Sequence, residues 1–465
     1  MKTGYIFLVF LGSFLHFSLS KILFVFELFR HGTRAPLLGK NNFREEYTDP
    51  FGIKWKLNGK LTSMGLRMQY ILGTHHRLKY SSLISTIKDP KELLVVSTMT
   101  SRTIASAQAH LMGMFPLQSA GLLQNEEVPK ANPPIPIDDK LSREIEKLGI
   151  QALPGKIQNV PINYFDLKEI FTILTKSEIC PKLKSYKENN RKHQRITDFF
   201  NKLNNTYGKE LMKFFKKNDT SFLYNYFEVF SLADNFVTAY ESQKNMSEFA
   251  SYGIDLEKFN KLCVEMRSLF LLETENTEEI SPLAVSITLP KVIQWMEKKL
   301  NSDNLSDNQT EINFNEPKIV LYSGHDSTLS PFELFFHKVF NTSIIYPNFG
   351  ANLVLELHKN ETNNEYYVEY LFNGELMIRM NFWDFKRRVL NEIWDDGQIR
   401  KFCNNEFFQW SNKTVYILVL GILFVVFIGM FSIYYFKKQV SDSEKKNEKE
   451  KGKEMMLNSS DEENH

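Results

Sequence analysis

A short segment of this chain could bind an anion and attack it. The segment reads Arg30-His31-Gly32-Thr33-Arg34. The planar guanidinium of arginine pairs two donors with two oxygens of a phosphate or carboxylate group. Gly32 lets the backbone turn sharply and come close to a ligand. A histidine held between two arginines would face the bound anion, so His31 is a candidate nucleophile.

Two further segments carry side chains suited to the same anion. Arg102 follows the stretch 92–97, which predicts a strand, and it stands near the start of a predicted helix. Anions bind at strand ends and helix N-termini in such sheets. His325 and Asp326 follow another predicted strand, 318–322. His325 could bind phosphoryl oxygens, and Asp326 offers a carboxyl group that could transfer a proton.

These segments share one position in the expected fold, the carboxyl end of a strand. The mostly apolar run 22–29 predicts a strand buried on both faces, with one acidic residue, Glu27. The carboxyl ends of neighbouring parallel strands open into one crevice. The sequence therefore predicts an α/β fold in which one crevice holds arginines, histidines and the carboxyl group.

The sequence predicts no metal site and no cofactor. His75 and His76 lie on a predicted helix, but no cysteine or further histidine stands at ligand spacing. The arginines themselves supply the positive charge that a bound phosphate needs. The chain has 57 basic and 55 acidic residues, so its balanced charge does not favour a nucleic-acid partner.

The rest of the chain divides into regions of different pattern. Amphipathic stretches predict helices at 190–204, 210–230, 255–272 and 283–300. We therefore expect an α/β catalytic domain, 21–160 and 301–405, with an all-helical lobe, 161–300, inserted in it. Beyond residue 349, partly alternating apolar residues predict a late antiparallel pair of strands at the sheet edge.

The two ends of the chain predict secretion and membrane anchoring. Residues 1–20 combine Lys2, an apolar run and small residues near the end, which is typical of a signal peptide. Residues 415–436 are 22 residues without a charge, enough for a helix that spans a bilayer. The tail, 437–465, is rich in Lys and Glu and should be disordered. We expect a single-pass type I membrane protein with a lumenal or extracellular catalytic domain, in a lysosome- or endosome-like compartment or at the cell surface.

Sites for modification accompany this expectation. Acceptor sequences for N-glycosylation occur at Asn204, Asn218, Asn245, Asn304, Asn308, Asn341 and Asn360. The chain is rich in Asn, so chance alone would produce several of them. The three cysteines allow at most one internal disulfide and leave one thiol. Cys263 lies in a helical pattern and is expected to be buried. The oligomeric state stays open, with a homodimer as one candidate.

The segment from Arg30 to Pro36 resembles the signature of the histidine acid phosphatases. This family is a branch of the histidine phosphatase superfamily and includes lysosomal and prostatic acid phosphatases and phytases. The helix that begins Leu61-Thr62, the block around Arg102 and the His325-Asp326 pair resemble further motifs of the family. The resemblance implies a phosphoglycerate-mutase-like mixed sheet flanked by helices, and a disulfide between Cys180 and Cys403. Relatives often have Asp before the block's arginine, where this chain has Ser101.

The chemistry and the resemblance assign the same roles. His31 attacks phosphorus and forms a phosphohistidine, and Asp326 protonates the leaving alkoxide and then activates water. The substrate's phosphoryl oxygens are bound by Arg30, Arg34, Arg102 and His325. The substrate is then a small phosphate monoester. Two alternatives remain at this point, a phytase that acts on inositol phosphates and a non-catalytic receptor that binds phosphate.

Overall fold

A computed structural model describes residues 20–37, 46–56, 58–85, 90–164, 180–304, 316–403, 424, 426–441, 443 and 445. The predicted signal peptide lies outside these residues except for Ser20, as do the acceptor Asn308 and most of the predicted tail. The chain forms two units, one up to Cys403 and one from Asn404. In the second unit, residues 426–441 are helical. No helix within the described residues is long and apolar enough to cross a membrane.

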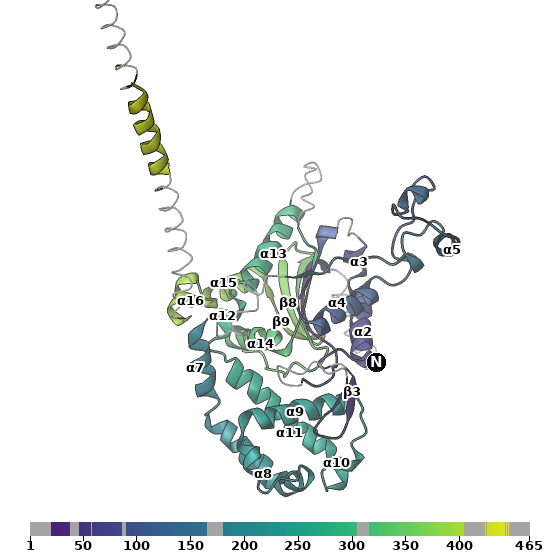
Figure 1. The fold of residues 1–465 in the computed structure, drawn as a ribbon. Coiled ribbons are helices and arrows are strands. Elements are labelled where there is room, and N and C mark those ends of the chain that lie inside the picture. The colour runs from purple at the N-terminus through teal and green to yellow at the C-terminus, as the bar shows by residue number, and fades with distance from the viewer. Residues whose placement is uncertain are drawn as a thin grey trace, which may run out of the picture. The chain divides into compact units, whose positions relative to one another are not determined.

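The first unit is built around a seven-stranded mixed sheet with the order β5-β4-β6-β1-β7-β8-β9 (Figure 1). Its strands are β1 (Ser20–Arg30), β4 (Leu93–Ser97), β5 (Asn163–Tyr164), β6 (Ile319–Gly324), β7 (Asn352–Asn360), β8 (Tyr366–Phe372) and β9 (Glu375–Asn381). Strands β5, β4, β6 and β1 are parallel, whereas β7, β8 and β9 pair antiparallel. The α/β fold with a mixed sheet is thus confirmed, and β9 extends the predicted antiparallel pair. A separate hairpin joins β2 (Glu46–Thr48) to β3 (Lys54–Lys56).

Helices cover both faces of the sheet, as strand β1 requires. Phe26 and Leu28 of β1 enter one apolar core, and Val25 and Phe29 enter the opposite core. Each such buried side chain contributes about 1.5–3 kcal/mol. The first core is closed by α12 (Ser281–Val285), α13 (Thr288–Asn304), α14 (Asp326–Phe340) and α15 (Phe382–Glu392), and the second by α2 (Ser63–Lys79), α3 (Ser81–Ile84) and α4 (Ser101–Met114). Because side chains alternate along a strand, Glu27 lies on the face under α2 and α4.

A helical region with its own core lies below the sheet in Figure 1. It contains α7 (Pro181–Asn190), α8 (Gln194–Phe214), η5 (Ser221–Tyr224), α9 (Tyr226–Glu241), α10 (Ser247–Ser251), α11 (Leu256–Leu269) and the π-helical turn η6 (Phe270–Glu275). The predicted continuous helix 210–230 is wrong, because the chain turns between α8 and α9. Asp219 accepts a hydrogen bond from the backbone of Ser221, and Asn225 caps α9. Such local bonds compete with helix formation although apolar residues continue at helical spacing.

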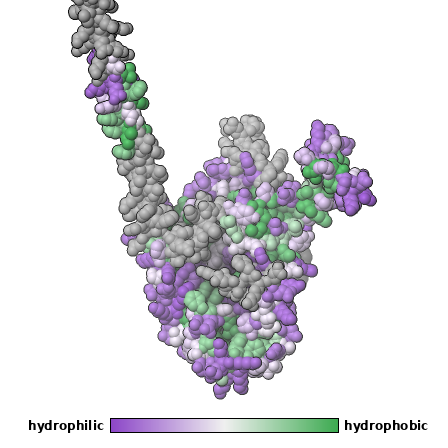
Figure 2. All heavy atoms as spheres, in the orientation of Figure 1, coloured by the Kyte–Doolittle hydropathy of each residue, from purple (hydrophilic) through white to green (hydrophobic). Residues whose placement is uncertain are grey.

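An arm, residues 115–162, connects α4 to β5 and holds η3 (Val128–Ala131), α5 (Asp139–Leu148) and η4 (Pro154–Lys156). Figure 2 shows both apolar and hydrophilic residues on the arm's surface. Between η2 (Pro90–Glu92) and this arm run β4 and α4. At the end of the unit, Cys403 of α16 (Asp396–Cys403) forms a disulfide with Cys180, which precedes α7. Cys263 is a buried free thiol in the helical core, which confirms the expectation for that residue.

Candidate functional site

Three neighbouring strands bring the predicted site residues to one edge of the sheet. Strand β6 lies between β4 and β1, and the register aligns Arg30 with Gly324 and Ser97 with Ser323. The residues that follow these strand ends therefore meet. Gly32 allows the loop after β1 to pack closely against α2, because a Cβ there would come 2.3 Å from the carbonyl oxygen of Gly65. The structure places Arg30, His31, Arg34, Arg102, His325 and Asp326 together at this edge.

His31 is held in one tautomer by two contacts. Its Nδ1 lies 2.8 Å from the carbonyl oxygen of Gly32, which can only accept a hydrogen bond. The proton is therefore on Nδ1, and Nε2 accepts a hydrogen bond from Nε of Arg102 at 3.1 Å. Burial and then the charges of Arg30 and the neighbouring basic groups lower the pKa of His31 well below its ordinary value. The ring is thus neutral, with a lone pair on Nε2.

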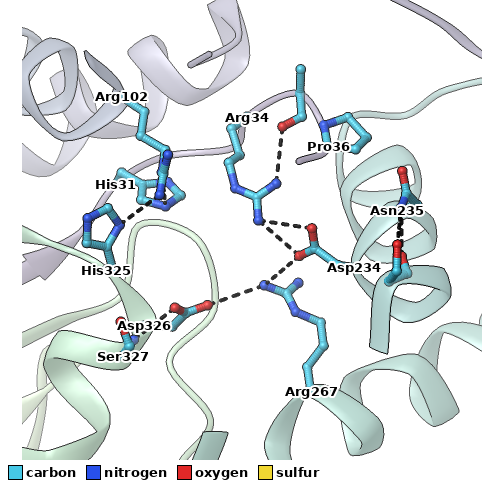
Figure 3. Close-up of polar contacts among 12 residues, drawn as sticks. His31, Arg34, Pro36, Arg102, Asp234, Asn235, Arg267, His325, Asp326 and Ser327 are labelled. Carbon is cyan, nitrogen blue, oxygen red and sulfur yellow. Dashed lines mark hydrogen bonds and ion pairs between the residues drawn. The ribbon is translucent and has the colours of Figure 1, made fainter. Parts of the chain in front are cut away.

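His325 is also neutral and is oriented by threonines. Arg102 Nη2 donates to Nδ1 of His325 at 3.3 Å, so the ring proton is on Nε2. This Nε2 lies 2.9 Å from Oγ1 of Thr98, which is itself 2.8 Å from Oγ1 of Thr103. Burial and the charge of Arg102 lower the pKa of His325 to about 3. Arg102 therefore links both imidazoles (Figure 3).

Arg30 and Arg34 are buried but differ in their partners. Nη2 of Arg30 lies 2.7 Å from Oδ2 of Asp326, and Nη1 donates to the carbonyl oxygen of Pro347. The guanidinium also packs over the ring of Phe349, 4.1 Å from its centroid. Arg34 is held elsewhere, because its Nη2 donates to both carboxylate oxygens of Asp234 at 3.0 and 3.1 Å. The two arginines of the motif are thus fixed before any ligand binds.

The structure adds two residues that sequence reasoning missed, Arg267 of α11 and Asp234 of α9. Nη2 of Arg267 lies 3.5 Å from Oδ2 of Asp326 and 3.6 Å from Oδ1 of Asp234 (Figure 3). Neither residue belongs to a recognisable motif, and each is an isolated charge in a helix. Four guanidiniums and two carboxylates leave two net positive charges at this edge, the charge that a phosphate dianion would neutralise.

Asp326 is the first residue of α14, directly after the N-cap residue His325. Its Oδ1 accepts a hydrogen bond from the backbone of Ser327 at 2.8 Å. Burial alone would raise the pKa of Asp326, but Arg30 and Arg267 hold it well below its ordinary value. Without a ligand the carboxyl group is therefore ionised. It remains accessible, with 26% of its side chain exposed.

A cavity of about 340 Å³ opens over these groups. Its lining includes His31, Arg102, His325 and Asp326, together with Arg34, Asp234 and Arg267. The helical region supplies further lining residues, which include Phe230, Phe270 and Lys187. Lys187 is paired with Glu275 at 2.8 Å. The cavity is thus lined by charged side chains and, from the helical region, by aromatic ones.

Ligands of the kind that bind metals meet elsewhere among the described residues. Glu27, His76 and His110 form one such group, and Glu356, His358 and Glu369 form another. Both groups are buried and separate from the residues that line the cavity.

Comparisons with known proteins give one consistent result. Residues 21–373 match the profile of the histidine phosphatase superfamily (branch 2). Testicular acid phosphatase of Mus musculus is 35% identical over 124 residues, which cover 26% of this chain and only 29% of that protein. Prostatic acid phosphatase of Bos taurus is 24% identical over 76% of this chain and 77% of its own length. Among solved structures, a phytase from Citrobacter braakii superimposes with a TM-score of 0.52 at 14% identity, over 80% of this chain and 98% of that one. The structural likeness shows the same fold.

Proposed function

Because this chain belongs to branch 2 of the histidine phosphatase superfamily, we propose that it is an acid phosphatase acting through a phosphohistidine at His31. One observation carries the proposal. The Nδ1 proton of His31 is held by the carbonyl oxygen of Gly32, so the lone pair of Nε2 lies beside Arg102 in the charged cavity. A receptor that only bound phosphate would need neither a neutral imidazole nor a nearby carboxyl group.

The first step transfers the phosphoryl group to the enzyme. Nε2 of His31 bonds to phosphorus while the ester bond to the leaving oxygen breaks. Arg30, Arg34, Arg102 and His325 bind the phosphoryl oxygens and stabilise their charge in the transition state. Protonated Asp326 gives its proton to the leaving oxygen, so an alcohol departs. The Nδ1 hydrogen bond to the Gly32 carbonyl holds the ring in place throughout.

The second step returns the enzyme to its starting state. The Asp326 carboxylate accepts a proton from a water molecule, and the oxygen of that water attacks phosphorus. The bond between phosphorus and Nε2 of His31 breaks, and its electron pair returns to the nitrogen. Asp326 passes this proton to the departing inorganic phosphate, so the ionised carboxylate of the empty site is restored. Arg267 contacts Asp326 and Asp234 and positions the acid and, through Asp234, Arg34.

The cavity wall favours a monoester with an apolar leaving group over an inositol polyphosphate. Phe230 and Phe270 contribute aromatic surface, and Lys187 is already paired with Glu275. A polyphosphorylated ring would need several further cations for the phosphates that do not react. We therefore keep the phytase alternative as the less favoured substrate class.

The proposal is tested with purified protein and an aryl phosphate at mildly acidic pH. His31→Ala should abolish turnover and leave no acid-labile phosphoenzyme, and removal of one phosphate donor such as Arg102 should lower kcat about 10²–10³-fold. His193→Ala, at an exposed histidine far along the chain, is the matched control and should keep full activity. A wild-type protein that shows neither turnover nor a phosphoenzyme would contradict the proposal that the chain is an enzyme. An active His31→Ala variant would contradict the assignment of His31 as the nucleophile.

We further propose that the site works outside the cytosol, anchored by residues 415–436. The Cys180–Cys403 disulfide supports an oxidising compartment. Among the glycosylation acceptors, Asn218, Asn245 and Asn341 are exposed, and Asn204 and Asn360 are half-buried. Protease treatment of sealed, cytosol-side-out vesicles should remove only the tail after Lys437. A protected tail, or release of the protein by alkaline washing, would contradict the anchor.

A further inference from the structure

A buried carboxylate and two imidazoles meet between strand β1 and helices α2 and α4. Glu27 lies in β1, His76 in α2 and His110 in α4, and all three are almost completely buried. Oε2 of Glu27 lies 2.9 Å from Nδ1 of His76 and 3.6 Å from Nε2 of His110. The two imidazole nitrogens are 3.3 Å apart. Three potential ligand atoms thus form a compact triangle.

The size of this triangle matches a metal-binding site. A circle through three points separated by 2.9, 3.3 and 3.6 Å has a radius of about 1.9 Å. Zinc binds nitrogen and carboxylate oxygen at about 2.0–2.2 Å, so an ion just outside the plane of the triangle reaches all three atoms. Edges of a tetrahedron with such bonds measure about 3.3 Å, close to the mean of the observed distances.

The charge of Glu27 has no cationic partner among the described side chains apart from the two histidines. Its other contact is a hydrogen bond from the side-chain amide of Asn352, whose nitrogen lies 3.0 Å from Oε1. In the described part of the chain, Oε2 contacts only the two imidazoles, and Nδ1 of His110 makes no hydrogen bond. A buried carboxylate is costly unless it is paired or coordinates a metal. The cluster is therefore incomplete as a hydrogen-bonded network.

The second ligand cluster of the sheet provides a contrast. Glu356 pairs with Lys79 at 2.5 Å and accepts a hydrogen bond from Tyr80, and Glu369 pairs with Arg379. His358 lies between these two carboxylates. Side chains of the protein thus neutralise that cluster, and it needs no ion.

We propose that Glu27, His76 and His110 bind one zinc ion that joins β1 to α2 and α4. Mixed imidazole and carboxylate ligands at these distances suit zinc. The ligands must be deprotonated to bind a metal.

The surroundings provide access and orientation. A cavity of about 520 Å³ is lined by His76 and Asn352, and a water molecule from it could take the fourth position on the ion. The ring of His110 stacks on Phe29, with centroids 4.7 Å apart. The helices approach closely at Gly73, where a Cβ would come 1.9 Å from the carbonyl oxygen of His110. The ion would thus fix the same three elements that position His31 and Arg102.

The test is metal analysis of the full chain, purified with mild detergent and without a histidine tag from medium that contains zinc. After dialysis at neutral pH, the wild type should retain close to one zinc per chain by mass spectrometry. Glu27→Gln and His110→Asn should retain less than about a tenth of this amount. His358→Gln is the matched control, because it removes a buried histidine from between two carboxylates, and it should keep the zinc.

A second measurement needs no variant and so does not depend on variant folding. Cobalt added to metal-stripped wild type should produce the visible absorption of a tetrahedral site, and zinc should abolish it. Zinc should also raise the Tm of the stripped protein by several degrees. A wild type without bound zinc, without a cobalt spectrum and without a change in Tm would overturn the proposal. So would loss of zinc from His358→Gln with retention in His110→Asn.

Discussion

Replacement of Arg267 by methionine should move the alkaline limb of the pH dependence of kcat to higher pH. Asp326 must be protonated to act as the general acid, so kcat falls as the pH rises through the pKa of this group in the substrate complex. Arg267 holds that pKa down from 3.5 Å. Without the guanidinium, Asp326 keeps its proton to higher pH, and turnover persists there.

The distance sets the size of this effect. A unit charge at 3.5 Å is worth about 1.2 kcal/mol in water and about 4.7 kcal/mol at an effective dielectric constant of 20. At about 1.36 kcal/mol per pKa unit, the pKa of Asp326 should rise by about 1 to 3.5 units. Because 26% of the Asp326 side chain is exposed, we expect the lower part of this range.

The assay should use an alkyl phosphate, because a poor leaving group depends most on the proton from Asp326. Arg267→Lys keeps the charge and should shift the limb much less. Asp326 keeps its ion pair with Arg30 and Asp234 keeps that with Arg34, so Arg267→Met should still fold, which thermal unfolding can verify. A limb that stays in place or moves to lower pH in Arg267→Met would refute the assignment of Asp326 as the acid.

Three further changes test the framework around the site. Gly32→Ala should lower kcat and destabilise the protein by about 1–3 kcal/mol in denaturant unfolding, because the new Cβ would clash with the Gly65 carbonyl; unchanged stability would contradict this contact. Cys180→Ser, which breaks the bridge to Cys403, should lower the free energy of unfolding by up to about 5 kcal/mol, and an unchanged denaturant midpoint would argue against the bridge. Glu356→Gln should make the free energy of unfolding depend less on pH below pH 4.5. Burial alone would raise the pKa of Glu356, but its histidine and lysine partners lower it to about 2. In the wild type, about 3 kcal/mol of stability is therefore present above pH 4.5 and is lost as the pH falls toward 2. If the free energy of unfolding falls equally steeply with pH in the variant and the wild type, Glu356 does not have this stabilising role.

Sequence reasoning found the parts of the fold that follow from local pattern. The apolar strand before Arg30 and the parallel-strand rule predicted the α/β sheet, which the structure confirms. They also predicted that residues far apart in sequence would meet at one edge, where the structure places Arg102 and Asp326. The prediction depended on strand ends, whose positions are set by apolar runs that can be recognised in a single sequence.

Other parts depend on tertiary packing and have no local signature. Arg267 reaches Asp326 only because α11 packs beside the sheet edge, and its helical context resembles that of any surface arginine. His75 and His76 were considered without His110, because His110 is 34 residues away from His76 in sequence. Their meeting depends on the close approach of two helices at Gly73, which periodicity does not predict. The turn at Asp219 was missed because the apolar residues on both sides of it keep helical spacing.

The acidic pH preference that we propose follows from the protonation states of the site and the substrate. In the empty site the arginines keep Asp326 ionised, so the acid is not ready. A phosphate monoester has a second pKa near 6 and carries an exchangeable proton at pH 5. When the phosphoryl group binds, its negative charge screens Asp326 from Arg30, and the pKa of Asp326 rises. The phosphoryl group prefers to bind the arginines as a dianion, so its proton can pass to Asp326. The substrate thus brings the proton that its leaving group needs, so kcat/KM falls above the second pKa of the free substrate, whereas kcat follows the pKa of Asp326 in the complex.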